Sequence, residues 1–415
     1  LIWHSRFTGS WVNSFLASGP LVSIGRVSYP LYLWHWPILC LYAAYWFEVP
    51  NWVEALCLMV VALAISYLTK EYIEDPVRRE HWPGSTATSR VLVYAVVVVS
   101  LLGSFSFVMH RAAKQELASS PILKDTNFAK KDTPELQNYC THFVPYNGLK
   151  AREQCVKPEG VAPPNLLLWG DSHAAHYSPL FTRLASQGGY RYLMRTFSGC
   201  PPLSGTLPEW LDYVGGNSIK GSCEKFNREV IDELARSQSV SGVVLSAHWQ
   251  SHFGADVNYD INIPKRLRSK DDSFERNYVN LKETLDLLVE MKKRVLLILP
   301  TPNYFYNVPD CIARRGVSAC EFDTALFESQ RDAFLVAVKE IASNNSNFRY
   351  WDSSRLICDS MCRVQKAGVI LFTDETHISA SGARSMIDGS LSNHLRWALG
   401  EDDSESAVAL AETGL

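Results

Sequence analysis

Three residues of this 415-residue chain have the types and the order that nucleophilic catalysis requires. Ser172 follows an apolar run that begins at Leu166, and Asp374 lies three residues before His377 near the C-terminal end. A serine hydroxyl becomes a good nucleophile when a histidine removes its proton and a carboxylate keeps that histidine oriented. The sequence therefore predicts that Ser172 is a nucleophile, His377 its base and Asp374 the orienting acid, as in a serine esterase.

Strand-like and helical patterns alternate around these residues. Short apolar runs predict strands, and apolar residues recurring every three or four positions predict amphipathic helices. The predicted strands are 165–169, 190–197, 241–246, 294–300 and 348–351, and the predicted helices are 173–187, 223–237, 274–292, 326–343 and 380–399. This alternation is typical of an α/β fold with three layers, a parallel sheet between two layers of helices. Ser172 is expected at the carboxyl edge of that sheet, where such folds place their sites.

The first 110 residues carry three long uncharged stretches, at 27–47, 55–69 and 91–109. Each is long enough, or nearly so, to cross a hydrocarbon core of roughly 30 Å as a helix. We therefore predict about three transmembrane helices. Basic residues gather between the second and third stretches, at Lys70, Arg78, Arg79 and Arg90. The positive-inside rule places that loop in the cytoplasm and the residues after about 110 outside.

Cysteine usage agrees with an external domain. Eight of the ten cysteines follow residue 110 and fall into near neighbours: Cys140/Cys155, Cys200/Cys223, Cys311/Cys320 and Cys358/Cys362. An even number of cysteines in an external domain favours disulfides, with local pairing as the simplest arrangement. The last pair could instead bind a metal, but no second Cys or His pair with the spacing of a zinc finger accompanies it. No metal site is therefore predicted. The formal net charge is -3, without the excess of basic residues that is typical of nucleic-acid-binding proteins, so nucleic acid is not an expected partner.

Composition divides the chain into five segments. The first is interfacial or incomplete, and because the chain begins at Leu1 without a methionine, we expect further membrane spans to precede it. The second holds the predicted membrane helices, the third is a polar, proline-containing linker, the fourth is the α/β domain and the fifth is a polar tail expected to be disordered. Their bounds are 1–18, 19–110, 111–164, 165–399 and 400–415.

Two sets of motifs resemble known families. Trp169-Gly170-Asp171-Ser172-His173 resembles the first block of the SGNH (GDSL-type) esterase and acyltransferase superfamily, and Asp374-x-x-His377 resembles its last block. The stretches 24–37 and 73–79 resemble the closing spans of the acyltransferase-3 family. These two domains occur fused in bacterial O-acetyltransferases of surface polysaccharides. The resemblance covers about residues 20–82 and 165–398.

The resemblance implies a membrane-anchored O-acyltransferase of the SGNH serine type. It would move an acetyl group through an acyl-Ser172 intermediate onto an envelope glycan such as lipopolysaccharide O-antigen. The chain would lie in the bacterial inner membrane as a multi-pass protein, with its SGNH domain in the periplasm and with the glycan and the lipid bilayer as partners. No bound cofactor is implied, and the acetyl donor would be acetyl-CoA, used on the cytoplasmic side by membrane spans that precede this chain.

Two alternatives stay open. A carbohydrate esterase would use the same three residues with water in place of the glycan hydroxyl, because both reactions share the acyl-enzyme. A non-catalytic glycan-binding module, left by a truncated gene, is the other. It is favoured by the incomplete set of membrane spans and opposed by the presence of Ser172, Asp374 and His377 together.

The family's oxyanion hole adds a glycine from a second block and an asparagine from a third. Gly199, after the second predicted strand of the α/β domain, is the candidate for the glycine. The third strand is followed by Ser246-Ala247-His248 with no Gly-x-Asn, so His248 is the candidate replacement donor, or a structural residue.

Several further residues have either a structural or a functional interpretation. His173 and His176 either line the site or pack beneath it, His35 is interpreted as a helix-packing residue, and Glu74 belongs to a cytoplasmic helix end. Four aromatic residues after predicted strands are candidates for stacking on sugars: Trp210, Tyr213, Trp249 and Tyr304.

Overall fold

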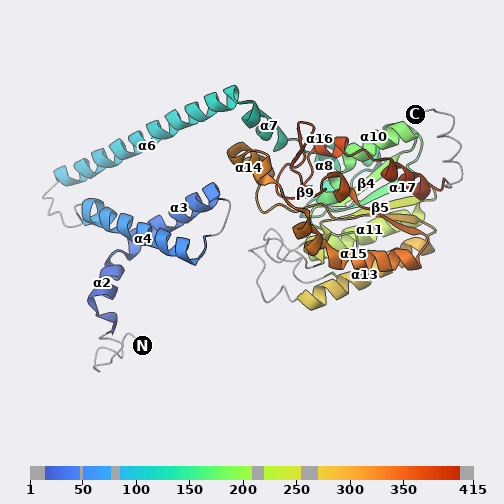
Figure 1. The fold of residues 1–415 in the computed structure, drawn as a ribbon, viewed down its shortest axis with the longest axis horizontal. Helices are drawn as coiled ribbons and strands as arrows, with labels where there is room; N and C mark the ends of the chain where they lie inside the picture. Colours follow the sequence, from blue (N-terminus) through green and yellow to red (C-terminus); the bar gives the residue numbers. More distant parts are fainter. Residues whose placement is uncertain (1–14, 47–49, 76–84, 208–218, 254–269, 402–415) are drawn as a thin grey trace. The chain divides into compact units, whose positions relative to one another are not determined.

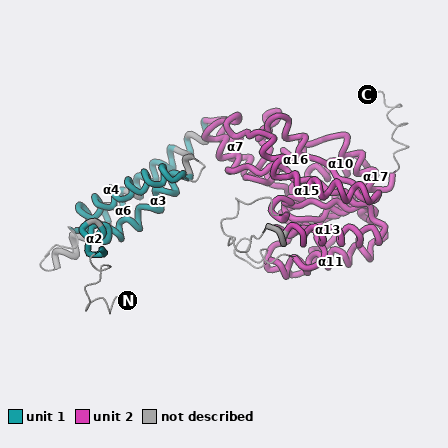
Figure 2. Tube along the Cα trace, turned by 60° about the horizontal axis from the view of Figure 1, so that its bottom comes forward, with its two compact units in different colours: residues 1–119 teal, residues 120–415 magenta. Residues whose placement is uncertain are grey.

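The protein is described by a computed structural model that falls into two compact units, residues 1–119 and 120–415 (Figure 2). The structure describes residues 15–46, 50–75, 85–207, 219–253 and 270–401. Several predictions lie outside the described residues. They are the roles of Arg78, Arg79, Trp210 and Tyr213, and most of the segments 1–18 and 400–415.

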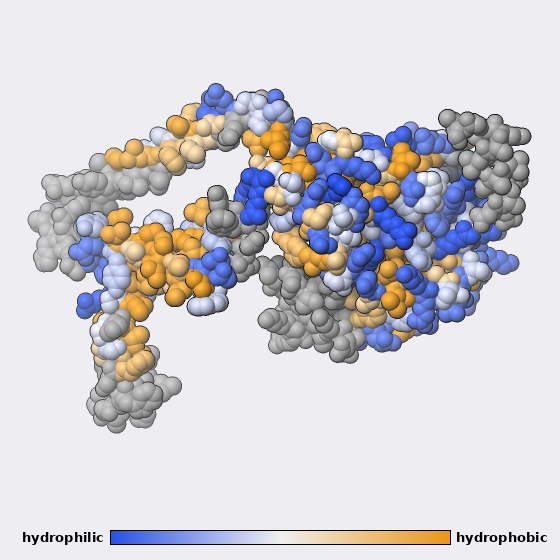
Figure 3. Space-filling model, in the orientation of Figure 1, coloured by the Kyte–Doolittle hydropathy of each residue, from blue (hydrophilic) through white to orange (hydrophobic). Residues whose placement is uncertain are grey.

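The first unit is helical. Its helices are α2 (Gly19–Arg26), α3 (Ser28–Trp46), α4 (Trp52–Thr69), the π-helical turn η2 (Lys70–Glu74) and α6 (Ser85–Ser119). α4 begins at a capping box, in which the side chain of Asn51 accepts from the backbone N–H of Glu54 and the Glu54 side chain accepts from that of Asn51. Hydrophobic side chains cover the visible surface of α3 and α4 (Figure 3).

Residues 28–46 of the first uncharged stretch form α3, and the second and third stretches lie within α4 and α6. In the described part of the chain, one helix, Trp52–Glu74, is both long enough and apolar enough to cross a membrane. The count of three spans therefore stays a prediction. His35 lies in α3 with its Nδ1 3.1 Å from the carbonyl oxygen of Leu31, one helical turn earlier.

The second unit is built on a seven-stranded sheet. Along it the strands run in the order β1-β4-β3-β5-β6-β8, all parallel, and β2 adds to β4 in the antiparallel sense. Their bounds are β1 (Thr141–His142), β2 (Val156–Lys157), β3 (Leu166–Gly170), β4 (Tyr192–Phe197), β5 (Gly242–Ser246), β6 (Arg294–Ile298) and β8 (Phe348–Trp351). The chain leaves β3 toward β4 and then returns to the other side of β3 for β5. Ligand sites in such folds lie at this reversal.

Helices cover both faces of the sheet, with α10, α16 and α17 on one face and α11, α13 and α15 on the other (Figure 1). Their bounds are α10 (Ser178–Gly188), α11 (Lys220–Arg236), α13 (Lys270–Glu290), α15 (Thr324–Asn344), α16 (Ala380–Ser385) and α17 (Gly389–Leu399). β3 and β5 are buried along their whole length, as expected for strands covered twice. The predicted three-layer α/β fold with a parallel sheet is confirmed.

Two predicted helices are each divided. The helix predicted at 173–187 is the short α9 (Ser172–Ala175) followed by α10, which restarts with a proline in its first turn. Pro179 has no N–H with which to continue the backbone hydrogen bonds of α9, so a new helix begins there. The helix predicted at 380–399 becomes α16 and α17, and Asp388 caps the second of these.

The segment 111–164, predicted to be a linker, contains regular structure. α6 reaches Ser119, and α7 (Pro121–Ala129), α8 (Glu135–Cys140) and the 3₁₀ turn η3 (Arg152–Cys155) follow, together with β1 and β2. The two strands are too short to give a periodic pattern in the sequence, which is why they were not predicted.

Local disulfide pairing is confirmed in the second unit. The four bonds are Cys140–Cys155, Cys200–Cys223, Cys311–Cys320 and Cys358–Cys362. Cys40 and Cys57, in the helical unit, are free thiols. The Cys358–Cys362 bond removes the thiolates that the alternative metal site would have needed.

Candidate active site

Ser172 sits in a turn that only glycine at position 170 permits. β3 ends at Gly170, and a Cβ built there would lie 1.7 Å from the carbonyl oxygen of Ser246 on β5. Asp171 then caps α9, with its Oδ1 accepting from the backbone N–H of His173 at 2.7 Å. The close packing of β3 on β5 thus places the serine at the carboxyl edge of the sheet.

The structure brings Ser172, His377 and Asp374 together, although 205 residues separate the first two in the sequence. His377 Nε2 lies 2.8 Å from Ser172 Oγ, and His377 Nδ1 lies 2.7 Å from Asp374 Oδ2. Asp374 Oδ1 also accepts from the backbone N–H groups of Thr376 and His377, both at 2.8 Å. The carboxylate therefore fixes both the ring and the backbone of the histidine.

The electrostatics of this pair suit a general base. Burial acts to lower the pKa of His377, but the hydrogen bond and charge of Asp374 outweigh it and the pKa is raised. Burial likewise acts to raise the pKa of Asp374, but the hydrogen bond from His377 outweighs it and the pKa is lowered. Asp374 thus stays ionised at neutral pH and stabilises the imidazolium that forms when His377 accepts a proton.

Asp171 links the turn that carries Ser172 to the loop after β5 through hydrogen bonds. Its Oδ2 accepts from the backbone N–H of His248 at 2.9 Å and from His252 Nε2, on α12 (Trp249–His252), at 3.0 Å. Burial lowers the pKa of His252 in spite of the adjacent carboxylate, so His252 donates as a neutral imidazole. Asp171 and His252 were not predicted, although Asp171 stands inside the motif that identified the serine.

His248 faces the same site. Its ring stacks on that of His173, with centroids 4.5 Å apart, and its Nε2 lies 2.8 Å from Asn303 Nδ2. Asn303 follows β6 and was also missed. A polar residue just beyond a strand of a parallel sheet was the signal that could have found it. Gly199 follows β4, the neighbour of β3, with a left-handed φ of +72° that favours glycine.

Two other parts of the domain, and a bond of its own, hold the segment that carries Asp374 and His377. The backbone N–H of Tyr304 donates to the carbonyl of Glu375 at 2.9 Å, and the carbonyl of His377 accepts from the backbone N–H of Thr373, also at 2.9 Å. From the segment that follows α7, the carbonyl of Asp132 accepts from the backbone N–H of Ala380 at 2.6 Å. Backbone hydrogen bonds therefore hold the Asp374–His377 segment both within it and just after it.

The remaining predicted site residues are structural. His173 and His176 are buried, and His176 Nδ1 accepts from the backbone N–H of Ile378 at 3.3 Å. Sugar stacking by Trp249 and Tyr304 is wrong, because both side chains are fully buried. Each donates a hydrogen bond to a backbone carbonyl: Trp249 Nε1 donates to Ile298 and the Tyr304 hydroxyl donates to Arg363.

Comparison with known proteins agrees with this geometry. Residues 139–388 match the family model described as an SGNH domain fused to AT3 domains. O-acetyltransferase OatA of Staphylococcus aureus (strain NCTC 8325 / PS 47) is 30% identical over 117 residues, which are 25% of this chain and 19% of that protein. The match thus spans about a fifth of the relative's length. The same level of identity is found for OatA of strain COL.

Two solved structures are also similar. The periplasmic domain of the lipopolysaccharide acetyltransferase of Salmonella ser. Paratyphi A is 18% identical, with a TM-score of 0.43 over 65% of this chain and 96% of that one. The aryl esterase of M. smegmatis is 13% identical, with a TM-score of 0.32 over 57% of this chain and 100% of that one.

Proposed function

The chain belongs to the family of SGNH domains fused to AT3 domains, and on that premise we propose that it is an O-acetyltransferase that acetylates an envelope glycan through Ser172. The observation that carries the proposal is the hydrogen-bonded series from Ser172 Oγ through His377 to Asp374, at 2.8 and 2.7 Å. These distances are those of a serine nucleophile with its base and the group that orients the base.

In the proposed first half-reaction, Ser172 Oγ attacks the carbonyl carbon of an acetyl donor while His377 Nε2 takes the hydroxyl proton. The carbonyl oxygen becomes an oxyanion, for which we propose the backbone N–H groups of Ser172 and Gly199 and the ring of His248 as donors. The intermediate collapses, the bond to the leaving group breaks, and His377 returns the proton to that group. Ser172 is left as an acetyl ester.

The second half-reaction reverses these roles. A glycan hydroxyl loses its proton to His377, attacks the acetyl carbon and displaces Ser172 Oγ, which recovers the proton. If water attacked instead, the same site would be an esterase. Transfer is favoured by the OatA relative, whose name describes an acetyltransferase.

We further propose that the helical unit anchors the domain in the bacterial inner membrane, with residues 120–415 in the periplasm. The apolar helix Trp52–Glu74, the exposed hydrophobic side chains of α3 and α4 and the four disulfides support this placement. The acetyl group is proposed to originate from acetyl-CoA on the cytoplasmic side and to be passed across the membrane by the AT3 domain to the donor that Ser172 attacks in the periplasm. The proposed acceptor is lipopolysaccharide or a similar glycan.

The test uses the full chain in detergent with p-nitrophenyl acetate as donor and a purified envelope polysaccharide as acceptor. Ser172→Ala is expected to abolish both release of nitrophenol and appearance of O-acetyl groups on the polysaccharide, which is measured by NMR. Unchanged acetylation by Ser172→Ala would overturn the proposal. Release of nitrophenol without any acetylated polysaccharide would replace it with an esterase.

A further inference from the structure

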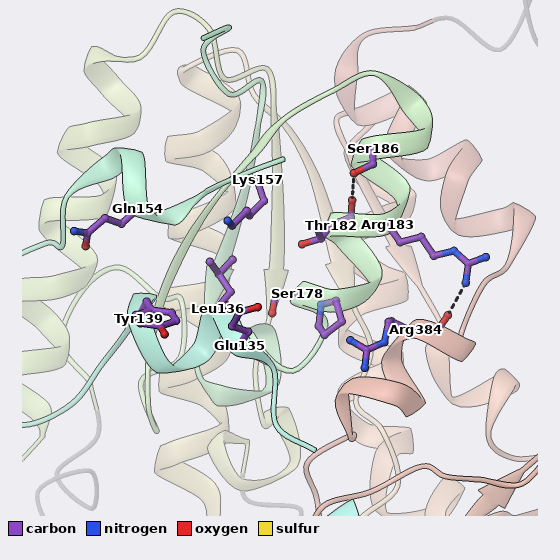
Figure 4. A pocket seen from close by; sticks show the side chains of 11 residues that line it. Glu135, Leu136, Tyr139, Gln154, Lys157, Ser178, Thr182, Arg183, Ser186 and Arg384 are labelled. Atoms are coloured by element: carbon purple, nitrogen blue, oxygen red, sulfur yellow. Dashed lines mark hydrogen bonds between the residues drawn. The ribbon is translucent and has the colours of Figure 1, made fainter. Parts of the chain in front are cut away.

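A hollow of about 530 Å³ lies away from the proposed catalytic residues, between α8, α10 and α16. Its lining includes none of Ser172, Asp374 and His377. Figure 4 shows Tyr139 and Lys157 on one side of the hollow and Arg384 on the other, with Glu135 and Ser178 between them. This volume is in the range of small-ligand sites in proteins.

The lining has an excess of positive charge. Lys157, Arg183 and Arg384 stand against one carboxylate, that of Glu135. Arg183 Nη1 donates to the carbonyl of Arg384 at 3.4 Å, which holds two cationic residues of α10 and α16 beside each other. The ammonium of Lys157 and the guanidinium of Arg384 would attract an anion in the hollow.

The side chains of Lys157 and Arg384 make only weak ion pairs within the described part of the protein. Lys157 Nζ contacts Glu159, whose side chain is 86% exposed, and such surface pairs contribute little. Arg384 is half exposed and lies 3.8 Å from Asp132. A ligand anion can therefore engage both side chains without breaking a buried interaction.

Two further groups point to a saccharide. The ring of Tyr139 is 60% exposed on α8, and exposed aromatic rings in polar hollows provide a flat apolar surface with a polar tip. Ser178 lines the hollow with a buried hydroxyl that has no hydrogen-bond partner among the described residues. An unsatisfied buried hydroxyl is costly, and a ligand hydroxyl would satisfy it.

The hollow lies within reach of the nucleophile. Ser178 follows Ser172 by six residues, so their Cα atoms are at most about 20 Å apart. From this placement and chemistry we propose that the hollow binds an acidic stretch of the same glycan chain that Ser172 acetylates. The inference rests on the proposed function for its acceptor. It adds that the acceptor is a polymer carrying carboxylate or phosphate groups.

The first test measures binding and does not depend on catalysis. The full-length Ser172→Ala chain in detergent is titrated with fluorescently labelled hexagalacturonate, an acidic oligosaccharide, and with maltohexaose, a neutral one of equal length. We expect binding of the acidic ligand only, weakened about tenfold by Lys157→Ala and by Arg183→Ala. Arg183→Lys should retain part of the affinity. Arg236→Ala, which removes an exposed cation from α11, is the matched control and should change nothing.

Equal affinity for both ligands, no binding of hexagalacturonate, or no effect of Lys157→Ala and Arg183→Ala would each overturn the inference. A second measurement separates this failure from failure of the proposed function. With Ser172 intact, Arg183→Ala should raise KM for a polymeric acidic acceptor and leave hydrolysis of p-nitrophenyl acetate unchanged. An equal loss of both activities would also contradict the inference.

Discussion

The carboxylate of Asp132 binds the first turn of α16, which begins just after His377: its Oδ2 accepts from the backbone N–H of Ser381 at 2.8 Å, across 249 residues of sequence. The Asp132 side chain is 9% exposed and its backbone carbonyl binds the N–H of Ala380. Asp132 therefore holds the start of α16, three residues beyond His377, to the segment that enters the second unit.

Asp132→Ala should lower kcat several-fold with little change in KM, because the start of α16, next to His377, loses an acceptor while the substrate surfaces stay intact. A side-chain acceptor at a helix start contributes about 1 kcal/mol. Asp132→Asn, which keeps one acceptor oxygen, should recover most of the activity. Steady-state kinetics with p-nitrophenyl acetate measure both. The matched control is Asp125→Ala, an exposed aspartate on α7. Normal kcat in Asp132→Ala would show that the contact is dispensable.

The activity should depend on pH through His377. As a base it works only when neutral, and because Asp374 raises its pKa, kcat/KM should rise with pH to a half-maximum above the ordinary value of about 6.5. Asp374→Asn removes the charge that raises the pKa and leaves burial, which lowers it. The acid limb should therefore move to lower pH while kcat falls about 10³–10⁴-fold. An acid limb at the same pH in both proteins would contradict this assignment.

His248 is proposed as an oxyanion donor, and His248→Ala should lower kcat by about 10²–10³-fold with KM nearly unchanged. Binding of a phosphonate analogue of the tetrahedral intermediate should weaken in parallel. His248→Asn restores a short side-chain donor and should recover part of the rate. If His248→Ala loses thermal stability but keeps its kcat, the residue is structural.

Asp171→Ala should destabilise the domain by at least about 3 kcal/mol, because three donors, two of them buried, from His173, His248 and His252, lose their acceptor together. A fall in Tm of several degrees, measured by circular dichroism, is the expected readout. His252→Ala removes one of the three and should cost less. A Tm equal to that of the unmodified chain would mean that water replaces the carboxylate at no cost.

The sequence was informative where a pattern is local. Buried strands such as Leu166–Gly170 appear as continuous apolar runs, so the sheet and the helices around it could be predicted. Neighbouring cysteines gave the disulfides, since short loops close most easily. Ser172 was found because it directly follows a buried strand of the parallel sheet, and the Asp374/His377 pair because an acid stands three residues before a histidine.

Other parts of the site could not be predicted in this way. Asp132 and His252 act through contacts with residues tens to hundreds of positions away, and nothing in their own neighbourhoods distinguishes them from surface polar residues. Trp249 and Tyr304 follow strands as sugar-stacking residues would, but their loops fold inward and bury them. Burial of a loop side chain depends on tertiary packing that periodicity does not record.

The central claim is that Ser172 carries the acetyl group, and trapping that ester tests it most directly. The full chain is mixed with p-nitrophenyl acetate, quenched in acid within one turnover, digested and analysed by mass spectrometry. His377→Ala, which keeps Ser172 but removes its base, is the matched control. We predict a single acetyl group on the peptide containing Ser172 and none in His377→Ala. Turnover of the donor with that peptide unmodified, and with an acetyl group on another residue, would contradict the account.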